Sequence, residues 1–169
     1  MVVTTTGAGL DVTPDFLGQQ LIPVFTQISF CFGIPDDYCV EDISRILNQG
    51  AERLARHFPW VAGQVVCEGA TETSTGLFKI KPFETTPRVW IKDLRDDPSF
   101  PSWDVLQQTN FPMNSLNESI VAPRKTLIAP SESAAEVFQL QATITKGGLI
   151  LTFLGHHQTM DGIPNTLES

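Results

Sequence analysis

The spacing of apolar residues in the first third of the chain predicts a strand followed by a helix. Between Val24 and Phe32, apolar side chains fall mainly on alternate positions, which is typical of a strand with one buried face. From about residue 38 to residue 57 the spacing becomes three and four residues, as on the buried stripe of a helix. Pro59 ends this helix, because a residue that precedes proline is disfavoured in helical geometry. The stripe consists of Val40, Ile43, Leu47, Ala51 and Leu54.

Further strands are predicted at residues 64–67, 77–81 and 88–91. Between residues 93 and 130 prolines recur and no period holds, so we expect mostly loop there, with one short helical turn near 102–107. Near the end of the chain, an alternating segment and a very apolar one flank a Lys-Gly-Gly turn and predict a hairpin. Its strands are residues 137–144 and 149–154.

Composition narrows the class of protein. A chain of 169 residues with 41% hydrophobic and 18% charged residues suits one globular domain. The net charge of −8 and the scattered basic residues argue against nucleic acid as a partner. We find no signal-like or membrane-spanning apolar run, and we expect a soluble cytoplasmic protein without membrane association. Three cysteines, Cys31, Cys39 and Cys67, lack metal-site spacing and are expected to be buried, reduced thiols.

Candidate chemistry lies where the last strand ends. His157 follows this strand directly, and Asp161 and Gly162 come four and five residues later. An imidazole can accept a proton near neutral pH, so His157 is a candidate general base, although an isolated histidine is more often a core residue. Because neighbouring strand residues face opposite ways, we assign His156 a packing or hydrogen-bonding role. A metal site is not expected, since no third ligand stands near His157 and Asp161 in the sequence.

Four segments, in order, resemble the N-terminal half of the BAHD-type acyl-CoA-dependent acyltransferases, in particular their fungal trichothecene 3-O-acetyltransferase-like branch. The resemblance implies half of a chloramphenicol-acetyltransferase-like fold: an α/β (α+β) domain with a mixed, mostly antiparallel sheet and a packed helix at about 38–57. Residues 1–169 would then form one N-terminal domain, which is incomplete compared with the family's enzymes because their second half has no counterpart here. The four segments are the strand at 24–32, the helix that runs into His57-Phe-Pro-Trp-Val-Ala-Gly-Gln64, residues 110–118, and residues 147–162 with their His-x-x-x-Asp-Gly block.

The resemblance implies that His157 takes a proton from a hydroxyl or amine of a small-molecule acceptor, which attacks the thioester of acyl-CoA, such as acetyl-CoA, directly. Asp161 would be a structural brace paired with an arginine, and Gly162 would turn the chain and keep the channel open. Acyl-CoA is a co-substrate, and no bound cofactor is implied. Pro164 stands where many members carry a second glycine. Candidates for the arginine are Arg45, Arg53, Arg56 and Arg88.

Two alternatives stay open from the residues. A condensation-domain-like fragment would also carry the His-His-x-x-x-Asp-Gly block but would use carrier-protein thioesters. A non-catalytic relic would bind a small molecule or a partner chain. Phe58 and Trp60 are expected to be core anchors, because they directly follow the amphipathic helix. The isolated chain is expected to have little acyltransfer activity, and to need a complementary C-terminal half or to self-associate through an uncovered apolar face.

Overall fold

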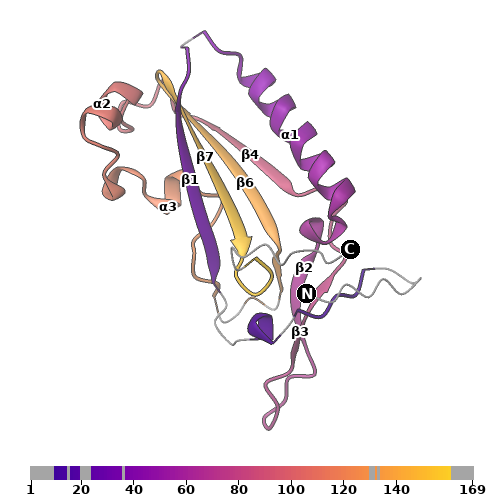
Figure 1. Ribbon diagram of the computed structural model, residues 1–169. Coiled ribbons are helices and arrows are strands. Elements are labelled where there is room, and N and C mark those ends of the chain that lie inside the picture. Colours follow the sequence, from indigo (N-terminus) through magenta and orange to yellow (C-terminus); the bar gives the residue numbers. More distant parts are fainter. Residues whose placement is uncertain are drawn as a thin grey trace.

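Two β-sheets and one long helix organise the part of the chain that the structure describes (Figure 1). The structure, a computed structural model, describes residues 10–14, 16–19, 24–35, 37–129, 132 and 134–160. A four-stranded sheet has the order β1-β7-β6-β4, and a smaller sheet has the order β3-β2-β5. The strands are β1 (Phe25–Gly33), β2 (Gln64–Glu68), β3 (Leu77–Lys81), β4 (Arg88–Asp93), β5 (Ala134–Glu136), β6 (Phe138–Thr145) and β7 (Gly148–His156).

The predicted hairpin is the centre of the larger sheet. β6 and β7 pair antiparallel with Thr145 opposite Gly148, and Lys146 and Gly147 form the turn between them. Gly147 has φ of 76°, a conformation that glycine adopts at little cost. β1 pairs antiparallel with the outer side of β7, whereas β4 pairs parallel with β6. The sheet is therefore mixed and mostly antiparallel, as the fold class required.

The helix α1 (Val40–His57) confirms the helix expected at about 38–57. Glu41 and Asp42 lie in its first turn and Arg56 and His57 in its last, which suits the helix dipole. Its apolar stripe packs on one face of the larger sheet, where Ile43 forms a buried cluster with Ala142 and Ile144 of β6. The chain then passes through a short 3-10 helix, Pro59–Ala62, into β2.

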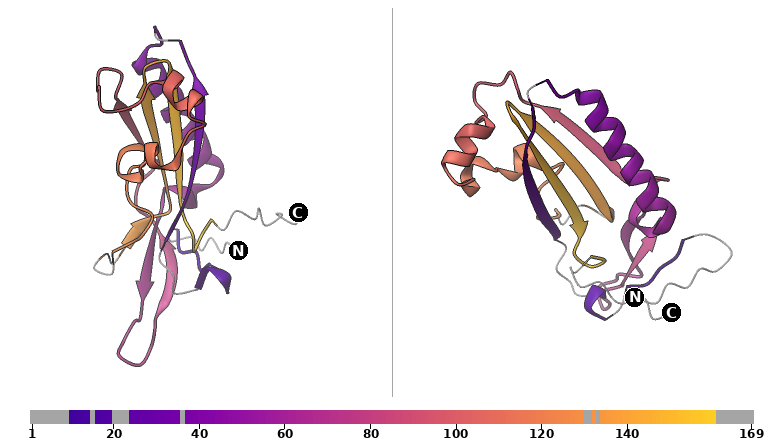
Figure 2. Two further views of the ribbon diagram at one scale, coloured as in Figure 1. Left: turned by 90° about the vertical axis from the view of Figure 1, so that its left-hand side faces the viewer. Right: turned by 45° about the horizontal axis from the view of Figure 1, so that its top comes forward.

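The opposite face of the larger sheet is covered by the proline-rich segment, as the edge-on view in Figure 2 shows. The expected helical turn near 102–107 is α2 (Trp103–Gln108), while the 3-10 helix Met113–Ser115 and α3 (Glu118–Val121) were not foreseen. Leu106 and Val121 are fully buried against Ile150 of β7. The segment is thus a packed layer rather than a loose connection.

That layer buries polar side chains of β6 and satisfies them. Gln141 Nε2 donates to the Ile120 carbonyl at 2.8 Å, and Thr145 Oγ1 donates to the Pro101 carbonyl at 2.7 Å. A buried polar group costs little when a partner meets it, so these hydrogen bonds fix how the segment lies on the sheet.

Several expectations were wrong in detail. The apolar face of β1 is not buried: Ile28, Phe30 and Phe32 are 50%, 50% and 46% exposed, because α1 covers only the β4–β6 side of that face. Phe58 is 41% exposed, since it caps α1 instead of entering the core, whereas Trp60 packs partly buried against the core. The cysteines are free, but Cys39 and Cys67 are exposed, because they stand at a helix cap and at the outer end of β2.

Strand β5 was not predicted, because three residues are too few for a period to show. Among the described residues, no helix is both long enough and apolar enough to cross a bilayer.

Candidate active site

The two adjacent histidines at the end of β7 lie in opposite environments. The backbone N–H of His156 donates to the Val137 carbonyl at 2.8 Å, and that of His157 donates to the Val24 carbonyl at 2.9 Å. The two peptide groups thus bond to the two neighbouring segments in turn, as along a strand, and the side chains point to opposite sides. His156 is 2% exposed, and His157 is exposed. The two imidazole rings therefore lie on opposite sides of the strand, as the alternation of side chains predicts.

A tight turn presents His157 to solvent. The backbone N–H groups of Thr159 and Met160 both donate to the His156 carbonyl, each at 2.9 Å. The turn brings Met160 over Gly155, where an added Cβ would lie 2.9 Å from the Met160 Sδ atom. A side chain at position 155 would have to displace the Met160 side chain, and the exposed imidazole of His157 lies on the outer side of the turn. An exposed imidazole there can exchange a proton with a molecule that approaches the strand end.

His156 sits in an aromatic and cationic environment. Its ring meets the edge of the Phe25 ring with centroids 5.3 Å apart, and these two residues are partners in the β1–β7 register. The Arg124 guanidinium lies over the Phe25 ring, 4.6 Å from its centroid. Burial, helped by the nearby charges of Arg124 and His157, lowers the pKa of His156 to about 4. His156 is therefore neutral at pH 7 and carries no charge beside His157.

No hydrogen-bond partner meets Nδ1 of His156 or Nε of Arg124 in the part of the chain that the structure describes. Two glutamates hold Arg124 in place, Glu132 at 2.5 Å and Glu136 at 3.6 Å. Reasoning from the sequence did not single out Arg124. Its one trace there is a lone pair of basic residues, Arg124 and Lys125, in a segment followed by these two acids.

Asp161 and Gly162, the other two expected site residues, lie outside the described residues, as does Pro164. Two of the arginines considered for Asp161 have other partners. Arg45 pairs with Asp42 at 2.6 Å, and Arg88 pairs with Glu84 at 2.6 Å and with Glu136 at 3.2 Å. The arginine partner of Asp161 stays a prediction, because Asp161 lies outside the described residues.

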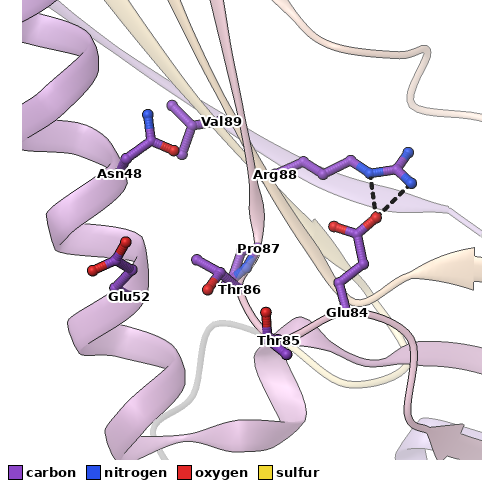
Figure 3. Close-up of a pocket in the computed structure, with 8 residues that line it drawn as sticks. All are labelled: Asn48, Glu52, Glu84, Thr85, Thr86, Pro87, Arg88 and Val89. Atoms are coloured by element: carbon purple, nitrogen blue, oxygen red, sulfur yellow. Dashed lines mark hydrogen bonds and ion pairs between the residues drawn. The ribbon is translucent and has the colours of Figure 1, made fainter.

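A pocket of about 480 Å³ lies elsewhere, between α1 and the start of β4 (Figure 3). Asn48 and Glu52 come from α1, and Thr86 and Arg88 come from the chain entering β4. None of its lining residues belongs to the turn that carries His157. In the described parts of the chain, no group of three or more His, Cys, Asp or Glu side chains is placed to hold a metal ion.

Comparison with known proteins shows which family this chain is similar to. The model of the trichothecene 3-O-acetyltransferase-like N-terminal domain matches residues 24–166. O-acetyltransferase dmxR13 of Cryptosporiopsis is 45% identical over 90% of this chain and 34% of its own length. Trichothecene 3-O-acetyltransferase TRI101 of Fusarium sporotrichioides is 44% identical over 94% of this chain and 36% of its own length.

Solved structures agree with the sequence matches. The crystal structure of F. graminearum TRI101 with coenzyme A and T-2 mycotoxin superposes with a TM-score of 0.83 at 42% identity, over 88% of this chain and 35% of that one. The F. sporotrichioides protein with coenzyme A and T-2 gives a TM-score of 0.82 at 44% identity, over 88% of this chain and 34% of that one.

The chain spans about a third of the length of these relatives. The expected fold, half of a chloramphenicol-acetyltransferase-like architecture, is confirmed by these superpositions. The match of the domain model over most of the sequence shows that the chain belongs to the trichothecene 3-O-acetyltransferase-like family and corresponds to its N-terminal domain.

Proposed function

We propose that this chain provides the general-base half of an acyl-CoA-dependent O-acyltransferase that acts on a hydroxyl group of a small secondary metabolite. The observation that carries the proposal is the exposed imidazole of His157 at the end of β7, beside a buried and neutral His156, in a family of O-acetyltransferases. Relatives of this family have been crystallised with coenzyme A, which supports acyl-CoA as the donor.

In the proposed reaction, a ring nitrogen of His157 accepts the proton of the acceptor hydroxyl. The oxygen then forms a bond to the thioester carbonyl carbon of acyl-CoA. The carbon–sulfur bond breaks, and the departing thiolate of coenzyme A takes the proton from the imidazolium of His157. The histidine ends as it began, and no acyl-enzyme forms. A neutral His156 helps, because a second positive charge beside His157 would oppose formation of the imidazolium.

Asp161 and Gly162 keep supporting roles in this proposal. The carboxylate of Asp161 would brace the turn through an ion pair, and Gly162 would let the chain bend away from the histidine. An acyl-CoA donor is favoured over a carrier-protein thioester, because the chain is 44% and 45% identical to acetyltransferases along nearly its whole length.

A single general base accounts for only part of such a catalyst. Positioned general-base catalysis supplies about 10²–10⁴-fold, while whole enzymes reach at least about 10⁶-fold. The difference must come from groups that hold both substrates and exclude water. The matched part is about a third of the length of the relatives. We expect these groups in the remaining two thirds.

A chimera tests the proposal. This chain would replace the matched segment of F. sporotrichioides TRI101, and release of free coenzyme A thiol from acetyl-CoA would be followed with T-2 mycotoxin as acceptor. We expect the chimera to turn over and His157→Ala to lower kcat by about 10²–10⁴-fold. The matched control is His57→Ala, which removes an exposed imidazole from α1 and should change kcat by less than about twofold.

Two outcomes would contradict the proposal. One is a folded chimera that is inactive while TRI101 itself turns over under the same conditions. The other is a His157→Ala chimera that keeps a kcat close to that of the unsubstituted chimera. Robust turnover by the isolated 169-residue chain, abolished by His157→Ala, would overturn the view that the site needs a second polypeptide.

A further inference from the structure

The N-terminal segment, residues 10–14 and 16–19, is attached to the outer edge of β3. Val12 and Ile80 exchange two backbone hydrogen bonds, of 3.1 Å and 2.8 Å, and both side chains are fully buried. In an antiparallel ladder alternate residues turn their backbone groups to the same side, so Phe78, like Ile80, presents its N–H and C=O to this edge. The Gln19 side chain meets both groups: the N–H of Phe78 donates to Oε1 at 2.9 Å, and Nε2 donates to the Phe78 carbonyl at 3.0 Å.

Charged side chains fasten the same segment to the smaller sheet. Asp11 lies 2.7 Å from Nζ of Lys81 and 3.6 Å from Nζ of Lys79. Glu68 of β2 lies 3.1 Å from Nζ of Lys79 and 3.2 Å from Nζ of Lys81. The hydrogen bond from Lys81 lowers the pKa of Asp11, so this carboxylate is ionised at neutral pH. An isolated surface ion pair stabilises little, but here two lysines and two carboxylates form one network beside a backbone already fixed at Val12.

The N-terminal segment reaches from this anchor to the turn that carries His157. Gly18 lies in the 3-10 helix Leu17–Gln19 and is buried. A Cβ added at Gly18 would overlap the carbonyl oxygen of Gln158, which directly follows His157, and would also overlap the Pro14 side chain. Figure 1 and both views of Figure 2 draw this short indigo helix beside the turn at the end of β7. The contact is backbone against backbone, and the missing side chain of Gly18 makes it possible.

The turn is fixed from inside and from outside. Inside it, the His156 carbonyl accepts hydrogen bonds of 2.9 Å from the backbone N–H groups of Thr159 and Met160 and from the Thr159 hydroxyl. Outside it, Met160 and Leu10 both pack, partly buried, against a hydrophobic cluster that includes Val12. A displacement of the N-terminal segment would therefore disturb the packing of the turn as well.

We propose that the N-terminal segment is a positioning element for His157, and that Gly18 is the residue through which it holds the turn. Backbone hydrogen bonds, the Gln19 amide and the ion network fix the segment on the smaller sheet, and Gly18 lies against the Gln158 carbonyl. A general base must lie within hydrogen-bond reach of the proton that it accepts, and a misplacement of about 1 Å can cost about 10²-fold in rate. This inference rests on the proposed role of His157 as the base.

A double-mutant cycle in the TRI101 chimera tests the inference. Gly18→Ala puts a methyl group where the Gln158 carbonyl lies, so the turn has to shift. We expect kcat to fall by at least about tenfold, with KM for acetyl-CoA and for T-2 mycotoxin within about twofold of the parent values. In the His157→Ala background the same substitution should change kcat by less than about twofold, because the group that it misplaces is gone.

Gly50→Ala is the matched control, since it adds the same methyl group at a position in α1 where the new Cβ meets nothing within 4 Å. It should change kcat by less than about twofold. If Gly18→Ala fails to fold, Gln19→Ala takes its place. It loosens the N-terminal segment without a clash by removing the hydrogen bonds to Phe78, and it should lower kcat only while His157 is present.

NMR of the 169-residue chain with labelled histidines gives a readout that is independent of catalysis. The chain has three histidines, His57, His156 and His157. Gly18→Ala should shift the imidazole resonances of His157 and leave those of His57, at the end of α1, in place. A His157 signal that does not move, or a loss of kcat that persists in His157→Ala, would overturn the inference. A fully active His157→Ala chimera would contradict the proposed function instead, and the His157 signal would then decide alone whether Gly18 holds the turn.

Discussion

Lowering the pH from 7 to 5 should destabilise this protein through His156. The ring is 2% exposed, and burial lowers its pKa from 6.5 to about 4 in the folded state. The unfolded chain therefore binds a proton over a pH range in which the folded chain does not. Above pH 6.5 neither state binds a proton at His156, and the protein has its full stability. As the pH falls toward the folded-state pKa, the unfolded chain binds a proton that the folded chain does not, and the free energy of unfolding decreases.

The size of the effect follows from the two pKa values. With 6.5 in the unfolded chain and about 4 in the folded chain, the linkage relation gives a loss of about 2 kcal/mol between pH 7 and pH 5. Carboxylates such as Glu118 and Glu132 have lowered pKa values because they accept hydrogen bonds from Thr126 and Arg124. These carboxylates lose their stabilising effect mainly below pH 5, because the ordinary glutamate pKa is 4.5.

Urea unfolding followed by tryptophan fluorescence at pH 7, 6 and 5 measures this loss. The protein should lose about 2 kcal/mol more than a His156→Gln variant over this range, because glutamine does not titrate. Leu127→Gln is the matched control: it puts the same glutamine at a side chain that is 74% exposed, removes no titratable group, and should leave the pH dependence as it was. Equal pH dependence in the protein and in His156→Gln would refute the reasoning that burial keeps this ring neutral.

Two further predictions concern the layer formed by the proline-rich segment. Leu106→Ala should lower the free energy of unfolding by about 2–5 kcal/mol, because Leu106 is fully buried, whereas Leu127→Ala, at a side chain 74% exposed, should cost less than about 0.5 kcal/mol. Thr145→Val should cost about 1–2 kcal/mol in the same urea measurement, because it removes the 2.7 Å hydrogen bond to the Pro101 carbonyl and keeps the shape of the side chain. A neutral Thr145→Val would mean that this hydrogen bond does not hold the layer in place.

The elements in which apolar residues are regularly spaced could be predicted from the sequence. Helix α1 has five apolar positions at helical spacing, and the β6–β7 hairpin has two apolar strands around a Lys-Gly-Gly turn. Local preferences and the tertiary structure agree there. The opposite orientation of His156 and His157 was also predictable, since it needs only the alternation of side chains along a strand.

Contacts between distant segments were beyond such reasoning. The parallel pairing of β4 with β6, the packing of the proline-rich segment on the sheet and the place of Arg124 near His156 join residues that no local pattern connects. The same limit explains the misreading of β1. Alternation in Phe25–Gly33 shows that one face is apolar, but not whether another element covers it.

By itself, the sequence determined the helix and strands whose apolar residues are regularly spaced, such as α1, β6 and β7, and it contained the histidine block through which the family could be identified. Only the tertiary structure decided that Gln141 and Thr145 are buried, that His156 is neutral, and that Phe30 is left half exposed. The physical reason is that a period reports how apolar each face of an element is. Burial and pKa depend on what packs against that face, and this comes from residues far away in the chain.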